Sequence, residues 1–183
     1  MSLIEEPGLA IRLMRDEPQD YELMSKWLTD DRVLEFYDGR DNPSDLDRVL
    51  AKYGPRGRGE DNVVPCMLEF NDSPIGYVQY YPVEDGEEYG IDNVEAVFGI
   101  ALFIGEPDFW DLGIGIRAMK MLASYLFSAL GAMRLVIEPH VTNERAIRCY
   151  ENSGFKKENV LPRRELHEGE LRDVWLMVRD RTD

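Results

Sequence analysis

The sequence predicts an α/β protein of the α+β type, with a mixed, mostly antiparallel sheet of six to seven strands and about four flanking helices. Its 183 residues are a usual length for one domain. Strand-like runs first follow one another through short turns and later alternate with helical runs, an order typical of such a sheet. Because no repeat or linker divides the chain, we expect a single domain over residues 1–183. Residues 1–3, which are typical of a cloning remnant, are left out of the element predictions.

The first third of the chain predicts one strand and two helices. Alternating apolar residues indicate a strand over 9–14. Apolar residues at helical spacing over 21–28, preceded by Asp20, indicate the first helix. A second helix is expected over 43–53, with Gly54-Pro55 ending it. The sequence between these helices is predicted to be a break in the helical structure.

The rest of the chain supplies most of the sheet. Two β-rich runs separated by a short polar turn predict a hairpin, and the later runs alternate between strand and helix. Asparagine and glycine at the two ends of the last helix are typical cap residues. The expected elements are strands at 63–70, 74–81 and 97–104, a helix at 116–130, a strand at 133–139, a helix from Asn143 to Gly154, and strands at 155–161 and 172–178.

The charge balance is strongly acidic. Lysine and arginine total 21 against 36 aspartates and glutamates, for a net charge of -15. This opposes a phosphate-binding nucleic-acid surface and suits a cationic partner, although acids also simply keep a protein soluble. No apolar run approaches the ~20 residues of a membrane span, and no signal segment is evident. We therefore expect a cytoplasmic protein without a nucleic-acid or membrane partner.

Cysteine and histidine are too sparse for a recognisable metal motif. Cys66 and Cys149 fall in a predicted strand and a predicted helix, and their spacing favours buried thiols over a disulfide. His140 and His167 are the only histidines, and neither belongs to an HExxH motif or a ligand-like pair. We therefore expect no metal site.

The stretch "FWDLGIGIRAMKMLASYLF" places two glycines before an amphipathic helix. A P-loop is excluded because the required lysine and hydroxyl are missing. A dinucleotide fingerprint would fit Gly113 to Ala118 with Glu138 beyond, but the loop follows polar residues rather than a buried strand. Two interpretations remain: an anion site at a helix N-terminus, suited to a diphosphate, or a tight turn that binds nothing.

Three motifs resemble the GCN5-related N-acetyltransferases. "WDLGIGIRAM" is similar to that superfamily's coenzyme A loop, "NERAIRCYENSGF" to its Asn…Ala…Tyr…Gly-Phe helix, and "PIGYVQY" to its central hairpin strand. The resemblance implies that superfamily's fold, acetyl-CoA as the cofactor, and acetyl transfer to an amine. The family loop usually begins with glutamine or arginine where this chain has Trp110. This departure removes a side chain but leaves the backbone N–H groups.

Within the superfamily, the chain resembles the aminoglycoside 6'-N-acetyltransferases over residues 9–180. Stretches such as "WLTDDRVLEFYDGRD" and "LPRRELHEGE" are similar to the acetyltransferase half of the bifunctional acetyltransferase-phosphotransferase resistance enzymes. This implies a small cationic acceptor, the 6'-amine of an aminoglycoside, and a role in antibiotic resistance. Those enzymes carry a functional aspartate where this chain has Ala101. Two alternatives therefore stay open: another amine, on a protein N-terminus, polyamine or siderophore precursor, or a non-catalytic module that binds acyl-CoA or an antibiotic.

The resemblance assigns a role to Tyr150 and to a set of coenzyme-binding residues. Tyr150 would hydrogen-bond the leaving thiolate, with a core tyrosine as the structural alternative. Phe103 and Ile104 would pair with the pantetheine amides like an additional strand. Asn143 is equally well explained as an N-cap. The expected cofactor-binding residues are Phe103, Ile104, Trp110, Gly113, Ile114, Gly115, Ile116, Asn143 and Ala146.

Four residues are expected on the acceptor side. Glu138 and Glu168 would hold substrate amines, and Tyr37 and Tyr53 would wall the pocket. The alternatives are solvated acids and simple aromatic packing. The acidic stretch 84–95 would add long-range attraction for a polycation. We expect a monomer or a homodimer.

Overall fold

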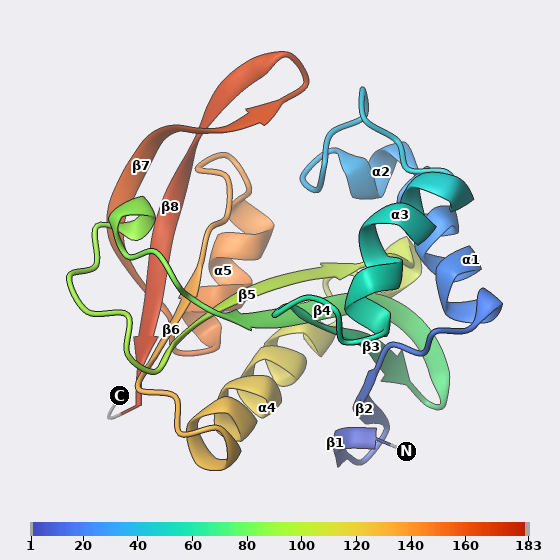
Figure 1. The fold of residues 1–183 in the computed structure, drawn as a ribbon, viewed down its shortest axis with the longest axis horizontal. Helices are drawn as coiled ribbons and strands as arrows, with labels where there is room; N and C mark the ends of the chain where they lie inside the picture. Colours follow the sequence, from blue (N-terminus) through green and yellow to red (C-terminus); the bar gives the residue numbers. More distant parts are fainter. Residues whose placement is uncertain (1, 182–183) are drawn as a thin grey trace.

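The computed structural model describes residues 2–181 as an eight-stranded sheet with helices on both faces (Figure 1). The strand order is β1-β2-β3-β4-β5-β6-β8-β7, and only β5 and β6 run parallel. The strands are β1 (Ser2–Glu6), β2 (Leu9–Leu13), β3 (Val64–Phe70), β4 (Ser73–Pro82), β5 (Val97–Ile104), β6 (Arg134–Ile137), β7 (Lys156–His167) and β8 (Glu170–Asp180). The helices are α1 (Pro18–Trp27), α2 (Asp31–Leu34), α3 (Leu46–Gly57), α4 (Ile114–Ala129) and α5 (Glu144–Asn152), with short 3-10 turns at Glu87–Tyr89 and Pro107–Phe109.

The mixed, mostly antiparallel sheet is confirmed, but it contains more strands than the six or seven predicted. The additional strand is β1, which includes Ser2 and Leu3 from the segment left out of the prediction and pairs with β2. The segment 29–33, predicted as a break, lies largely within the short helix α2, which spans 31–34. Within residues 2–181, no helix is both long and apolar enough to cross a membrane.

Helix α1 begins earlier than predicted because Asp20 has a tertiary role. Glu17 occupies the cap position without a side-chain hydrogen bond, and Pro18 begins the first turn. Asp20 therefore lies inside the helix and is buried. Its two carboxylate oxygens accept hydrogen bonds of 2.6 and 2.8 Å from the guanidinium of Arg12 on β2. This buried ion pair fastens α1 to the sheet.

Helix α3 begins and ends later than predicted. Asp45 caps it by accepting a hydrogen bond from the helix backbone, so Pro43 precedes the helix instead of lying in its first turn. Gly54 and Pro55 lie within the last turn instead of ending it. A proline near a helix end removes only one backbone donor, and the Arg58 N–H still donates to the Gly54 carbonyl at 3.1 Å.

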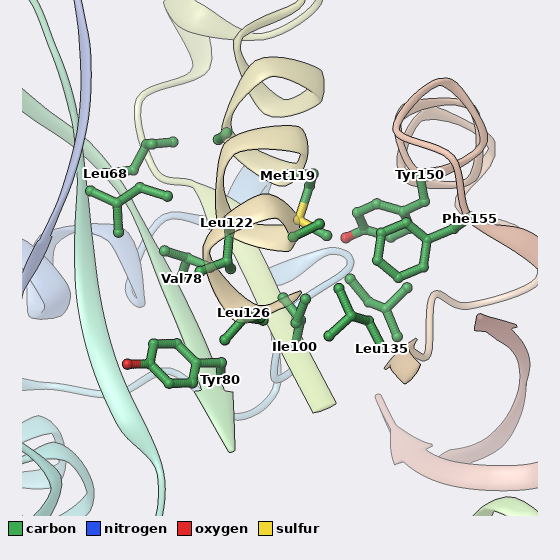
Figure 2. Packing of buried hydrophobic residues seen from close by; sticks show 14 of the residues in the cluster. Leu68, Val78, Tyr80, Ile100, Met119, Leu122, Leu126, Leu135, Tyr150 and Phe155 are labelled. Atoms are coloured by element: carbon green, nitrogen blue, oxygen red, sulfur yellow. The ribbon is translucent and has the colours of Figure 1, made fainter. Parts of the chain in front are cut away.

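Alternate residues of the central strands face two separate cores. Val78 on β4 faces α4, where it packs with the fully buried Met119 and Leu122 (Figure 2). Its neighbour Tyr77 points to the opposite face and packs with Trp27 of α1. Side chains of a strand alternate between faces, so β3, β4 and β5 are covered on both sides. Helices α4 and α5 cover one face, and α1 to α3 cover the other.

Strands β5 and β6 separate after three residue pairs. Their parallel register joins Val97 to Arg134 and ends with Gly99 opposite Val136. Strand β5 continues to Ile104, and no described strand pairs with residues 100–104 on that side. The sheet is therefore open along this edge, between the two groups of strands visible in Figure 1.

Candidate active site

A cavity of about 610 Å³ lies where β5 and β6 separate. Its walls come from the free part of β5, the start of α4, the segment after β6, α5, and residues of α2 and α3. Twelve of the fourteen predicted site residues line it: Tyr37, Phe103, Ile104, Trp110, Gly113, Ile114, Gly115, Ile116, Glu138, Asn143, Ala146 and Tyr150.

The start of α4 presents unsatisfied backbone donors to this cavity. Gly113 caps the helix with φ of +74°, a conformation that glycine adopts without strain, and no side chain caps the helix. The first N–H groups of a helix have no partner within it. Here the residues that carry them, 114–116, line the cavity. The helix dipole adds to their attraction for an anion such as a diphosphate.

The absence of a side chain at Gly115 lets α4 approach α5 closely. A Cβ built on Gly115 would lie 3.1 Å from Cys149 Sγ, which is closer than ordinary contact. Burial raises the pKa of the Cys149 thiol to about 11 and that of Cys66 to about 12. Both thiols are free, and Cys66 is buried as predicted, whereas Cys149 is half-buried and lines the cavity beside the glycine loop.

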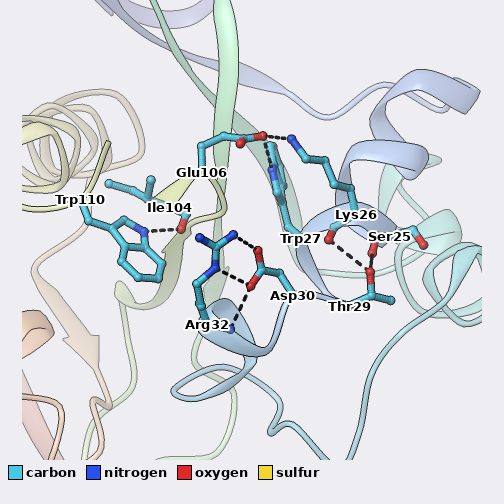
Figure 3. A network of polar contacts seen from close by, with 9 residues as sticks. All are labelled: Ser25, Lys26, Trp27, Thr29, Asp30, Arg32, Ile104, Glu106 and Trp110. Atoms are coloured by element: carbon cyan, nitrogen blue, oxygen red, sulfur yellow. Dashed lines mark hydrogen bonds and ion pairs between the residues drawn. The ribbon is translucent and has the colours of Figure 1, made fainter. Parts of the chain in front are cut away.

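Trp110 closes the end of the free β5 edge. Its indole N–H donates a 2.8 Å hydrogen bond to the Ile104 carbonyl (Figure 3). The guanidinium of Arg145 on α5 lies 4.0 Å from the Trp110 ring centroid, a cation-π contact. Trp110 occupies the position where similar coenzyme A loops usually have glutamine or arginine. Through these two contacts its ring connects β5 with α5.

The loop between β5 and α4 is held by α1 through Glu106. Its carboxylate accepts hydrogen bonds from the Trp27 indole N–H at 2.9 Å and from the Lys26 ammonium (Figure 3). Burial acts to raise the pKa of Glu106, but these hydrogen bonds lower it overall. Gly105 lies against the same indole, where a Cβ would come within 2.2 Å of the ring. Trp27 thus holds the loop close to α1.

Tyr150 reaches the cavity from α5. Asn143 caps this helix, as predicted, by accepting a 3.1 Å hydrogen bond from the Ala146 N–H. The Tyr150 ring is 6% exposed and packs beside Phe155 (Figure 2). Burial raises the pKa of Tyr150 above its usual value, so the hydroxyl stays protonated. No residue in the described part of the chain hydrogen-bonds this hydroxyl, which leaves it available as a donor.

Glu138 and Ala101 both line the cavity, each two residues beyond the last paired residues of β6 and β5. Burial raises the pKa of Glu138, although its carboxylate accepts a 2.9 Å hydrogen bond from Arg164.

Two predicted acceptor residues lie outside the cavity lining. Tyr53 is fully buried and packs edge-on against Tyr77, with ring centroids 5.4 Å apart. Glu168 lies between β7 and β8, where both oxygens accept hydrogen bonds from Arg40, one of them 2.8 Å long. These hydrogen bonds lower the pKa of Glu168 to about 2. Glu168 therefore connects the β7–β8 turn to the loop after α2 through this ion pair. Tyr37, in contrast, lines the cavity against Phe103.

The sequence did not single out Glu165 as a cavity residue. Strand β7 extends to His167, beyond its predicted end at residue 161, and its register with β8 shifts between Leu161 and Glu165. Glu165 therefore lines the cavity together with His140. His140 and His167 showed no ligand-like spacing, yet their ring centroids are 4.5 Å apart. His167 lies at the end of β7 and His140 forms a β-bridge with Val174 of β8, so the β7–β8 hairpin places the two rings side by side.

A family model for the GNAT acetyltransferase domain matches residues 16–162. The chain belongs to the GNAT acetyltransferases. An aminoglycoside N(6')-acetyltransferase type 1 of Klebsiella pneumoniae is 26% identical over 162 residues, which cover 84% of this chain and 77% of that protein. The fold of AAC(6')-Ib in complex with ribostamycin and coenzyme A gives a TM-score of 0.80 at 25% identity, covering 96% of this chain and 94% of that one.

The likeness in fold extends to a structure solved with a different amine. Spermidine N-acetyltransferase from Vibrio cholerae, in complex with CoA and spermine, gives a TM-score of 0.77 and covers 97% of this chain and 98% of that one. At 17% identity, this match concerns the fold alone.

Proposed function

We propose that this GNAT enzyme transfers an acetyl group from acetyl-CoA to a primary amine of a small cationic acceptor, with the 6'-amine of an aminoglycoside as the leading candidate. The main support is one cavity that combines a free strand edge, a helix N-terminus without a side-chain cap and a buried tyrosine hydroxyl. The likeness to aminoglycoside N(6')-acetyltransferases supports the choice of acceptor.

The coenzyme is proposed to lie along the opening between β5 and β6. The N–H groups at the start of α4 would bind its diphosphate, because they have no partner within the helix. The pantetheine arm would add to the free edge of β5 at Phe103 and Ile104, in the manner of an extra strand. Trp110 already occupies the Ile104 carbonyl, so the arm would pair with the remaining backbone groups of this edge.

The proposed reaction is a direct attack by the acceptor amine. The nitrogen lone pair forms a bond to the thioester carbonyl carbon, and the C–S bond then breaks. The Tyr150 hydroxyl donates a hydrogen bond to the departing sulfur, and the proton lost by nitrogen passes to solvent. A donor fixed in a buried site stabilises the developing charge without reorganising, which lowers the barrier.

On the acceptor side, Glu138 is proposed to hold a substrate ammonium. It lines the cavity two residues after the end of the β5–β6 pairing, as Ala101 does on the other strand. Tyr37 would form the adjoining wall. Glu168 and Tyr53 do not line the cavity, so we assign them structural roles. Glu168 forms an ion pair with Arg40, and Tyr53 packs against Tyr77.

A second class of acceptor is favoured by Arg56. Its guanidinium lines the cavity and donates a 2.9 Å hydrogen bond to Gln79, which is paired with Ala101 across β4 and β5. Asp61, 3.4 Å from Arg56 Nε, offsets part of this positive charge, and the remainder attracts an anionic group. An amine that also carries a carboxylate, such as an amino acid derivative, is therefore the runner-up.

The test measures thiol release from acetyl-CoA against kanamycin-type aminoglycosides, polyamines, amino acids and short peptides. Turnover on aminoglycosides supports the leading acceptor, and turnover on carboxylate-bearing amines alone supports the second class. If acetyl-CoA binds but no amine in the panel is acetylated, the proposed acceptors are wrong and a binding module becomes the better interpretation.

A further inference from the structure

His140, Glu165 and His167 form a cluster, here called the His-Glu-His cluster, beside the cavity. One nitrogen from each imidazole and one carboxylate oxygen all lie within 4.8 Å of one another. Both histidines are buried, at 6% and 3% exposure, whereas the Glu165 side chain is 43% exposed. The cluster thus combines two fixed nitrogens with one oxygen that has room to move.

The hydrogen bonding of His167 leaves one ring nitrogen without a proton. Its Nε2 lies 2.8 Å from the Glu35 backbone carbonyl. A carbonyl only accepts, so Nε2 carries the hydrogen, and Nδ1 of the neutral ring has a free lone pair. This buried Nδ1 has no hydrogen-bond partner among residues 2–181. Histidine ligands of metals are typically oriented in this way, with the second nitrogen donating to a backbone carbonyl.

His140 supplies the second nitrogen in a fixed position. A β-bridge to Val174 of β8 holds its backbone, and its Nε2 lies 2.9 Å from Glu165 Oε2. An unpaired buried nitrogen is costly, and a cation that accepts the lone pairs of both rings removes that cost. Binding would displace the proton between His140 and Glu165. Because these two residues line the cavity, an ion could enter from there.

We propose that the His-Glu-His cluster binds one divalent transition-metal ion, with Zn²⁺ as the expected occupant. Two imidazole nitrogens and one carboxylate oxygen are a typical set of zinc ligands, and the fourth position would face the cavity. Tetrahedral ligands at ~2.1 Å lie roughly 3.4 Å apart, and the three ligand atoms already lie within 4.8 Å of one another, so binding requires them to approach by at most about 1.4 Å. The proposal does not depend on the acceptor or on the acetyl transfer reaction.

The test titrates the full chain, free of any affinity tag, with ZnCl₂ in competition with a chromophoric chelator. Glu165→Ala removes the mobile ligand and His140→Ala removes one nitrogen. Glu170→Ala, an exposed position on the same hairpin, is the matched control. Thermal melting without metal establishes that each variant is folded. Titration with CoCl₂ provides a second readout, because tetrahedral Co²⁺ absorbs strongly in the visible range.

The proposal predicts one equivalent of Zn²⁺, intense Co²⁺ absorption bands, and an affinity at least about tenfold weaker in Glu165→Ala and His140→Ala. Glu170→Ala should match the wild type. The proposal is overturned if no saturable binding is seen, or if Glu165→Ala and Glu170→Ala bind equally. Glu165 is partly exposed, so its variant keeps the test decisive even if a substitution at His140 prevents folding.

Discussion

Removing the Tyr150 hydroxyl should slow acetyl transfer about 100-fold or more without unfolding the protein. A hydrogen bond to charge that develops in a buried site is worth about 3 kcal/mol, and each 1.36 kcal/mol is a factor of ten in rate. The ring would remain in its contact with Phe155 in Tyr150→Phe. Because the hydroxyl has no hydrogen-bond partner within the described range, its loss leaves no protein group unsatisfied. The stability change should therefore stay below about 1 kcal/mol.

The assay compares steady-state thiol release, acetyl-CoA affinity and thermal melting for Tyr150→Phe and Tyr80→Phe. Tyr80 is a matched control, because it is also 6% exposed in the same core but does not line the cavity (Figure 2). We expect the loss in kcat alone, and only for Tyr150→Phe. Because burial raises the pKa of Tyr150, ionisation of its hydroxyl should cause no fall in rate below about pH 10. A near wild-type kcat in Tyr150→Phe, or an equal loss of kcat in Tyr80→Phe, would rule out a catalytic role for the Tyr150 hydroxyl.

Four further predictions concern the coenzyme loop, the acceptor, the fold and the thiols. Gly113→Ala and Gly131→Ala should each lower the free energy of unfolding, measured by chemical denaturation, by about 1–2 kcal/mol, since both glycines have positive φ and open space at Cβ. Only Gly113→Ala should weaken acetyl-CoA binding measured by calorimetry. Glu138→Gln should raise the acceptor KM about tenfold, and an unchanged KM or an equal rise in Glu158→Gln would contradict the ammonium contact. Asp20→Ala should lower the free energy of unfolding by about 2–3 kcal/mol, because the buried Arg12 guanidinium loses its bidentate partner and keeps only Glu69, at 2.6 Å from Nε. A loss under about 1 kcal/mol would show that the Arg12–Asp20 pair is unimportant. Burial raises the pKa of Cys149 to about 11 and of Cys66 to about 12, so little of either thiol is thiolate at pH 8 and the reactive fraction grows only as the pH rises. Both thiols should therefore react slowly with a chromogenic disulfide at pH 8 until the chain is denatured. Rapid reaction of the native protein would contradict this.

Local patterns predicted the elements whose boundaries depend on nearby residues. Strand β5 has its predicted bounds, 97–104, because a continuous apolar run lies between polar segments. Helix α5 begins after Asn143 because the cap is a local hydrogen bond. Asp20 was misplaced because its partner, Arg12, lies on another element. Tertiary ion pairs of this kind have no periodic pattern in the sequence.

The candidate site was predicted in part for the same reason. Motif resemblance indicated Tyr150 and the glycine loop, and the structure brings them into one cavity. The free edge of β5 depends on where β6 ends, which no motif states. Glu165 was missed because the register shift in β7 places it in the cavity wall. A long hairpin with an irregular register is not visible from alternation alone.

The most direct test of the central claim is to identify the product formed from acetyl-CoA and kanamycin. Mass spectrometry would count the acetyl groups, and NMR would locate them. A single acetyl group on the 6'-nitrogen is expected, formed at a much lower rate by Tyr150→Phe. Unmodified kanamycin in the presence of bound coenzyme, or acetylation at another nitrogen, would contradict the proposed acceptor.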